Sequence, residues 1–129
     1  MTSTGVRREQ RGAIAIEFML VLSMLIVVFL VLLQYAVQAH ARRIATAAAE
    51  EGLAVASAYD GTSEAGISTA QQYLGDLSPG LSNTLVTASR TATTASVHVE
   101  GEVVQLVPFL PVHVSVDVEA PVERFVGAP

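Results

Sequence analysis

A single carboxylate interrupts the long apolar segment near the start of this chain. Between residues 13 and 33 the only polar side chains are those of Glu17 and Ser23. An ionisable residue inside a membrane helix is costly and usually marks a function, because lipid does not solvate its charge. Near the membrane edge the cost is smaller, so Glu17 also fits an incidental charge that reaches the aqueous interface.

Basic residues precede this segment and acidic residues follow it. In the first twelve residues the basic side chains are Arg7, Arg8 and Arg11, and the only acidic side chain is Glu9. Ten of the twelve Asp and Glu residues lie from Glu50 onward, the chain has no lysine, and its net charge is -5. Nucleic-acid binding is not expected, because neutralising phosphates requires clustered Lys or Arg.

The sequence offers no catalytic centre. It has no cysteine, phosphate-binding loop, zinc-protease helix motif or nucleophile elbow, so we do not expect an enzyme. His98 and His113 have the same parity on two expected neighbouring strands, near Glu100, which would allow a cross-strand metal pair. Two histidines without a third converging ligand more often face solvent on a sheet. We therefore expect neither a metal ion nor another cofactor.

The apolar segment is long enough to cross a bilayer, since it exceeds the run of about 18 apolar residues typical of a membrane helix. It is also longer than the apolar part of a secretory signal, about 7–15 residues, and no helix breaker follows it. We expect residues 1–12 to stay in the cytoplasm, because basic flanks face that side, and residues 13–37 to form a transmembrane helix.

The helix pattern continues beyond the apolar segment, over residues 38–59. Its apolar residues recur every three or four positions, which predicts an amphipathic helical stalk. This narrow, alanine-rich stripe suits close packing on another helix or on the distal part of the chain. The stripe consists of Val37, Ala41, Ile44, Ala48, Gly52, Val55 and Tyr59.

Residues 60–129 are expected to form a small extracytoplasmic α+β domain. Asp60 and Gly61 end the first helix, and a second helix begins at Thr62 or Ser63 and ends near Asp76. Valine-rich alternation then predicts an antiparallel sheet, with strands at residues 85–90, 97–106 (interrupted near Gly101) and 112–118. Residues 108–111 connect the last two strands. There Phe109 and Leu110 are expected to fill the edge of the sheet, with contact to a partner as the alternative.

The front of the apolar segment resembles a prepilin. Residues 11–22 (RGAIAIEFMLVL) are similar to the start of TadE-like minor pseudopilins of Tad-type pilus systems, and residues 47–52 (AAAEEG) resemble the helix that follows their membrane segment. The similarity extends from about residue 11 to residue 58. In this family the signal peptide ends in glycine, the fifth mature residue is glutamate, and an aromatic residue follows, as Gly12, Glu17 and Phe18 do here. Ser23 departs from the family, many of whose members have proline there.

This resemblance implies a function in assembly. A prepilin peptidase would cleave between Gly12 and Ala13 and remove a leader that carries the three arginines. Glu17 would then pair with the new amino terminus of a neighbouring pilin or pseudopilin, and the helix would engage the assembly platform and membrane lipid. The protein would lie in the cytoplasmic membrane as a single-pass protein or be incorporated into a pilus. Alternatives are a pseudopilin of a type II secretion system and an uncleaved bitopic membrane protein.

Overall fold

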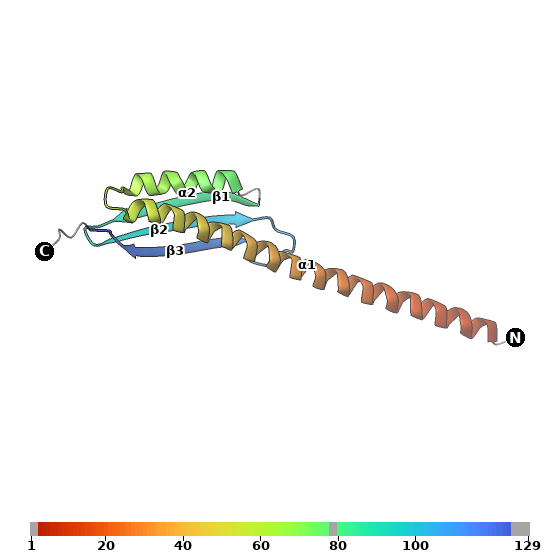
Figure 1. Cartoon of the computed structure of the whole chain (residues 1–129). Helices are drawn as coiled ribbons and strands as arrows, with labels where there is room; N and C mark the ends of the chain where they lie inside the picture. Colours follow the sequence, from red (N-terminus) through yellow and green to blue (C-terminus); the bar gives the residue numbers. More distant parts are fainter. Residues whose placement is uncertain (1–2, 78–79, 125–129) are drawn as a thin grey trace.

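The structure is a computed structural model that describes the backbone of residues 3–77 and 80–124 and the side chains of residues 8–76 and 80–124. It contains two helices followed by three strands. Figure 1 shows a long helix whose C-terminal half lies against a small sheet while its N-terminal half projects away from it. The expected α+β class, with a long helix, a short helix and a small antiparallel sheet, is confirmed.

Helix α1, Ser3–Ser57, is continuous through both the apolar segment and the amphipathic segment. The Ser23 hydroxyl donates a hydrogen bond to the carbonyl oxygen of Met19 at 2.7 Å, so this polar group is satisfied within the helix. The helix ends where the Gly61 N–H donates to the carbonyl oxygen of Ala58 at 2.9 Å. A Cβ at residue 61 would lie 2.0 Å from the carbonyl oxygen of Val55, so this turn requires glycine.

Helix α2, Ser63–Leu77, begins with a capping threonine. The hydroxyl of Thr62 accepts a hydrogen bond from the Ala65 N–H at 3.1 Å, which satisfies one of the free donors of the first turn. The helix packs closely on α1 through two glycines. A Cβ on Gly66 would lie 2.8 Å from the carbonyl oxygen of Gly52, and one on Gly52 would lie 2.7 Å from that of Gly66. The absence of both side chains is what lets the helices approach this closely.

The sheet has the order β1-β2-β3 and is antiparallel throughout. Its strands are β1 (Leu81–Arg90), β2 (Thr94–Val103) and β3 (His113–Pro121). The sequence predicted an interruption of the second strand at Gly101, and this is wrong: β2 passes through Gly101, which pairs with Val114. The irregularity lies opposite, in β1, where the register shifts between Ser82 and Leu85 and Asn83 has a φ of 50°.

Both helices cover the same face of the sheet, α1 over β2 and β3 and α2 over β1. Small residues of α1 meet valines of the sheet, so the helix axis lies close to the strands. Val37, Ala41, Ile44 and Ala48 of the predicted apolar stripe pack in this core, and Gly52 lies against α2. Tyr59, at the end of the stripe, is exposed. The core consists of Ala41, Ala45, Ala48, Ala49, Leu53 and Ala56 of α1, Ala70 and Leu74 of α2, and Leu81, Val86, Ala95, Val97, Val99, Val103, Val114 and Val116 of the sheet.

Phe109 does not fill the edge of the sheet, as the sequence analysis had expected. Its side chain is 100% exposed, and its φ of 73° turns it away from the domain. Leu110, beside it, is half-buried.

Candidate assembly site on the N-terminal helix

The described side chains in the N-terminal half of α1 have almost no protein cover. The described residues contain one helix long and apolar enough to cross a membrane, and its most apolar window has a mean hydropathy of 3.0 and is 0% buried. Among its large side chains, Ile14, Phe18, Met24 and Phe29 are all 62–70% exposed. Apolar surface on this scale is unfavourable in water, so this part of the helix requires lipid or another protein around it.

Glu17 lies on this uncovered surface. Its side chain is exposed, and within the described part of the chain it has no hydrogen-bond or ion-pair partner. Ala13 precedes it by one helical turn, about 6 Å along the axis, so the two residues lie on nearly the same side of the helix. Phe18, the next residue, is 66% exposed. The carboxylate is therefore accessible to a group from outside this chain.

The basic residues before the apolar segment continue the same helix. Arg8 and Arg11 are exposed, whereas the side chain of Arg7 lies outside the described residues. At Gly12 a Cβ would meet no atom within 4 Å. The fold therefore does not demand glycine at this position, in contrast to residues 52, 61 and 66, and a requirement for it would have to come from another protein.

Gln34 joins the uncovered part of α1 to the distal domain. It is 1% exposed, and its Oε1 accepts a hydrogen bond from the Leu106 N–H at 2.7 Å. Its Nε2 donates to the carbonyl oxygen of Val104 at 3.2 Å. One amide side chain thus holds the chain that follows β2 against the helix, at the first residue after the apolar run. The sequence signal was a lone amide at that position, which does not reveal its partners.

Arg90 closes the other end of the domain. Its guanidinium donates to the carbonyl oxygens of Ala56, Ala58 (2.7 Å) and Tyr59 (3.4 Å) at the C-terminus of α1. Helix ends leave such carbonyls unpaired, and a cation also interacts favourably with the helix dipole there. The sequence analysis did not assign this role. The only signal was that Arg90 and Arg124 are the sole basic residues, apart from histidine, after Arg43.

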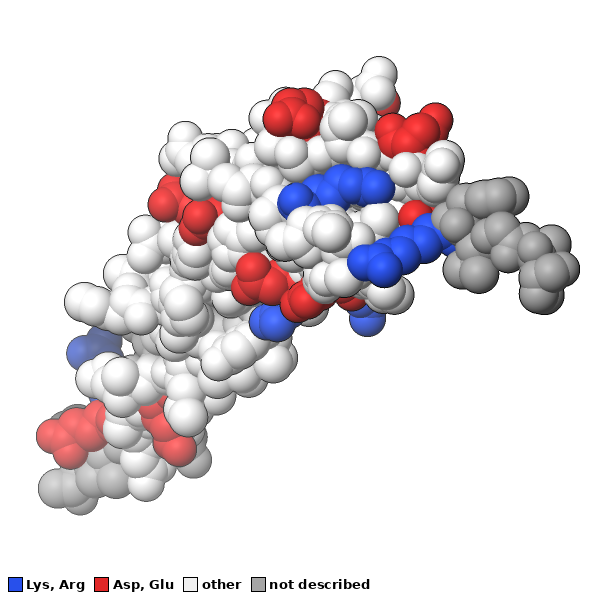
Figure 2. All heavy atoms as spheres, turned by 90° about the vertical axis from the view of Figure 1, so that its left-hand side faces the viewer, with Lys and Arg blue, Asp and Glu red and all other residues white. Residues whose placement is uncertain are grey.

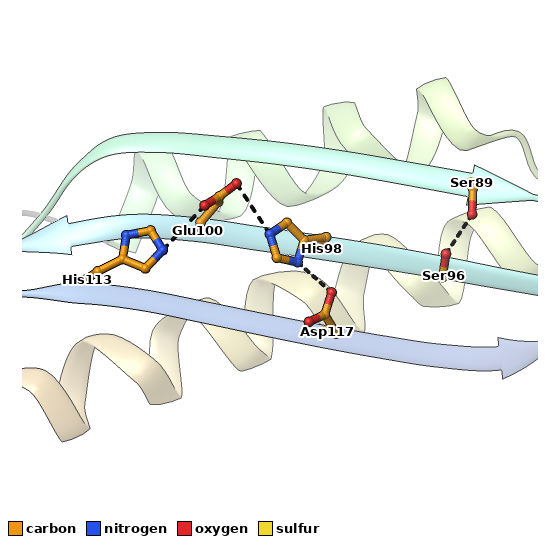
Figure 3. Close-up of polar contacts among 6 residues, drawn as sticks. All are labelled: Ser89, Ser96, His98, Glu100, His113 and Asp117. Carbon is orange, nitrogen blue, oxygen red and sulfur yellow. Dashed lines mark hydrogen bonds and ion pairs between the residues drawn. The ribbon is translucent and has the colours of Figure 1, made fainter.

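The open face of the sheet carries the two histidines considered as metal ligands. Figure 3 shows them on either side of Glu100: His98 Nε2 lies 3.3 Å from Glu100 Oε1, and His113 Nε2 lies 3.3 Å from Glu100 Oε2. His98 Nδ1 contacts Asp117 Oδ1 at 2.5 Å. The Asp117 hydrogen bond and charge, with a smaller contribution from Glu100, raise the pKa of His98 above 6.5 despite some desolvation.

This cluster is a network of side-chain contacts across the strands, which are ion pairs only where the imidazole is protonated. Glu100 occupies the space between the imidazoles and contacts each through a different oxygen. Among the residues with described side chains, no group of three or more His, Cys, Asp or Glu is arranged to hold a metal ion. Figure 2 shows charged groups of both signs scattered over the distal end, with uncharged surface between them.

Comparison with known proteins identifies a family for the N-terminal helix. Residues 12–53 match the family model described as TadE-like protein, which confirms the resemblance seen in the sequence. The matched stretch, under half of the chain, includes Gly12, Glu17, Gln34 and Gly52. No curated protein and no solved structure matches the chain.

Proposed function

We propose that this chain, whose residues 12–53 match the TadE-like family, is a non-catalytic minor pilin-like subunit of a Tad-type pilus system. A prepilin peptidase cleaves it between Gly12 and Ala13. The mature subunit is held in the cytoplasmic membrane by α1, with the distal domain outside the cytoplasm, and it takes part in pilus assembly. The family match suggests that the chain is related to Tad pili, and TadE-like proteins are generally structural and non-catalytic. Its cleavage, its orientation and its role in assembly are our proposal.

The observation that carries the proposal is the unpartnered Glu17 on an uncovered apolar helix. A carboxylate in this position bears a desolvation cost that no described residue offsets. Cleavage after Gly12 creates an ammonium group on Ala13, and the same group on a neighbouring subunit offsets that cost. Opposite charges attract strongly where the effective dielectric constant is low, so the pair favours one docking register over others.

The distribution of charge supports the orientation. Arg8 and Arg11 lie immediately before the apolar segment, and the positive-inside rule places such residues in the cytoplasm. Arg42 and Arg43, exposed on α1, follow the segment at about 14 Å from its end and would lie among the outer headgroups. The distal domain, with its acidic excess, then lies on the far side of the membrane.

The test separates processing from assembly in cells that carry the native pilus system. Glu17→Ala and Glu17→Gln should be processed normally, because the cleaved bond lies before Ala13, yet they should assemble few or no pili. Ser23→Ala is the matched control, since it removes the other polar side chain of the segment together with its bond to Met19. It should assemble normally. Pili at the native level from both Glu17 variants would contradict the proposed ion pair.

A further inference from the structure

The connection between β2 and β3, residues 104–112, is an uncharged and mostly apolar segment. Its sequence is VQLVPFLPV, in which Gln105 is the only polar side chain. Connections on the surface of a soluble domain usually carry polar and charged residues, because they face water. The composition of this one indicates a less polar environment.

Phe109 makes the connection unusual in conformation as well as composition. It is 100% exposed, and its φ of 73° lies in the left-handed region that bulky residues avoid. Val104, at the start of the connection, is 57% exposed. A strained backbone that presents an aromatic side chain outward points to a contact made outside the domain.

In the proposed membrane arrangement, the connection lies at the level where α1 would leave the bilayer. The hydrogen bonds of Gln34 to Val104 and Leu106 fix it beside the first residue after the apolar run. At 1.5 Å per residue, residues 13–33 span about 30 Å, which is the thickness of the hydrocarbon core. Figure 1 shows the connection at the end of the sheet that faces the N-terminal half of α1. In the proposed membrane arrangement, the connection that carries Phe109 would therefore lie near the plane of the lipid headgroups.

We propose that the β2–β3 connection is a second membrane contact, in which Phe109 and Leu110 insert into the interfacial layer of the leaflet that α1 leaves. This inference rests on the membrane anchoring included in the proposed function. Aromatic side chains favour the boundary between headgroups and acyl chains, and an amphipathic element needs to enter it by only about 5–10 Å. His113 and Glu102, polar residues opposite each other in the register at the strand ends beside the connection, would limit insertion to that depth.

The consequence is a fixed orientation of the distal domain. A single helix leaves a domain free to tilt and rotate above the membrane. A second contact, joined to α1 through Gln34, holds the sheet at one height and one rotation. Extraction of the subunit from the membrane into a fibre would then have to release the connection together with the helix.

The chain contains no tryptophan, so one substitution gives a unique fluorescent reporter. Phe109→Trp, Phe29→Trp and Tyr59→Trp are each reconstituted as full-length protein in phosphatidylethanolamine and phosphatidylglycerol vesicles. A parallel set contains lipid brominated near the carbonyl end of the acyl chains. Phe29 lies in the apolar segment and reports anchoring, whereas Tyr59 is 66% exposed at the far end of α1 and reports water.

The expected result is blue-shifted emission and strong quenching by the brominated lipid for Phe109→Trp, and emission typical of water with no quenching for Tyr59→Trp. If Phe29→Trp is quenched while Phe109→Trp resembles Tyr59→Trp, the second contact is refuted and anchoring stands. A blue shift of Phe109→Trp that disappears as lipid is added in excess would mean contact between protein copies, which also refutes it. Loss of quenching in Phe29→Trp would overturn the anchoring itself.

Discussion

The side-chain oxygen of Gln34 accepts a hydrogen bond of 2.7 Å from the backbone N–H of Leu106, across 72 positions in sequence. This bond and its companion to Val104 connect the membrane helix to the sheet. Because the side chain of Gln34 is 1% exposed, water has little access to the backbone groups that its amide binds. The distal domain and the helix are therefore one folded unit at this point, with no hinge between them.

Replacing Gln34 should loosen the β2–β3 connection. Gln34→Met keeps most of the volume but leaves the Val104 carbonyl and the Leu106 N–H without this partner, at a cost of about 1–3 kcal/mol in the free energy of unfolding. Hydrogen–deuterium exchange in detergent should show faster exchange at Leu106. Gln38→Met, one turn further along α1 and half-buried, is the control and should leave exchange in the connection unchanged. Unaltered exchange at Leu106 in Gln34→Met would contradict the described clamp.

The glycine contact between the helices predicts opposite effects for two substitutions in α2. Gly66→Ala places a Cβ 2.8 Å from both the Cβ of Ala56 and the Gly52 carbonyl oxygen, so α1 and α2 must separate. Overpacking of this kind costs about 1–3 kcal/mol, which exceeds the gain of about 1 kcal/mol from replacing glycine in a helix.

Gly75→Ala is the matched control for this prediction, because a Cβ there meets no atom within 4 Å. It should stabilise the protein by about 0.5–1 kcal/mol, the ordinary preference of a helix for alanine. Thermal unfolding in one detergent measures both variants. Equal melting temperatures for Gly66→Ala and Gly75→Ala would show that the helices do not pack at the distance described.

Arg90 should contribute more to stability than Arg124. Arg90→Met removes hydrogen bonds to three carbonyl groups at the end of α1, and charged hydrogen bonds contribute about 1.5–3 kcal/mol to the free energy of unfolding. Arg90→Lys should recover only part of this loss, because one ammonium does not reproduce the planar fork of donors. Arg124→Met, which removes one bond to Ala92 from an exposed residue, should change stability by no more than about 0.5 kcal/mol. Denaturant titration ranks the three variants, and equal losses for Arg90 and Arg124 would refute the capping role.

The pKa of His98 should depend on Asp117. The hydrogen bond and charge of Asp117 raise this pKa above 6.5, so the contact stabilises the folded state fully at pH values below 6.5 and its contribution is lost as pH rises through the higher, folded-state pKa. Titration of the His98 ring by NMR should give a midpoint above 6.5, and Asp117→Asn should lower it. Glu119→Gln, on the same face of β3 but paired with Ser96, should not. A midpoint that Asp117→Asn leaves unchanged would contradict the contact.

The sequence predicted the elements whose patterns are local. Four such patterns depend only on neighbouring residues: the apolar run up to residue 33, the turn at Gly61, the cap at Thr62 and the alternating valines of β3. The structure has helix, turn, helix cap and strand at these four places. The prediction at Gly101 was wrong because a glycine within a strand has two readings. It can interrupt its own strand, or it can leave room for a side chain of the neighbouring strand, as it does here. A Cβ at residue 101 would meet the side chain of Leu81 at 2.9 Å, and β1, rather than β2, became irregular.

The partners of Gln34 and Arg90 were not predictable from sequence. Both side chains bind backbone carbonyl or N–H groups that lie 31 to 72 positions away. Every residue offers a backbone carbonyl, and every residue except proline offers an N–H. No residue type therefore marks the receiving position. Glu17 was recognisable for the opposite reason, because a charge inside an apolar run is conspicuous without any knowledge of its partner.

Processing should depend on Gly12 although the fold does not. Because a Cβ at residue 12 meets no atom within 4 Å, Gly12→Val should leave the distal domain folded, with an unchanged melting temperature. The same variant should keep its leader in cells with an active prepilin peptidase, since the proposed cleavage follows this glycine. Gly75→Val, at another glycine with open space around it, should be processed normally. Removal of the leader from Gly12→Val at the native rate would contradict the assignment of the cleavage position.

The most direct measurement is the mature N-terminal sequence, determined by mass spectrometry on membranes from cells that carry the native peptidase. The account predicts that the chain begins at Ala13, one helical turn before Glu17. A retained leader in the presence of an active peptidase would contradict it, because no ammonium would then form at Ala13 and Glu17 would be an incidental charge of an uncleaved membrane anchor.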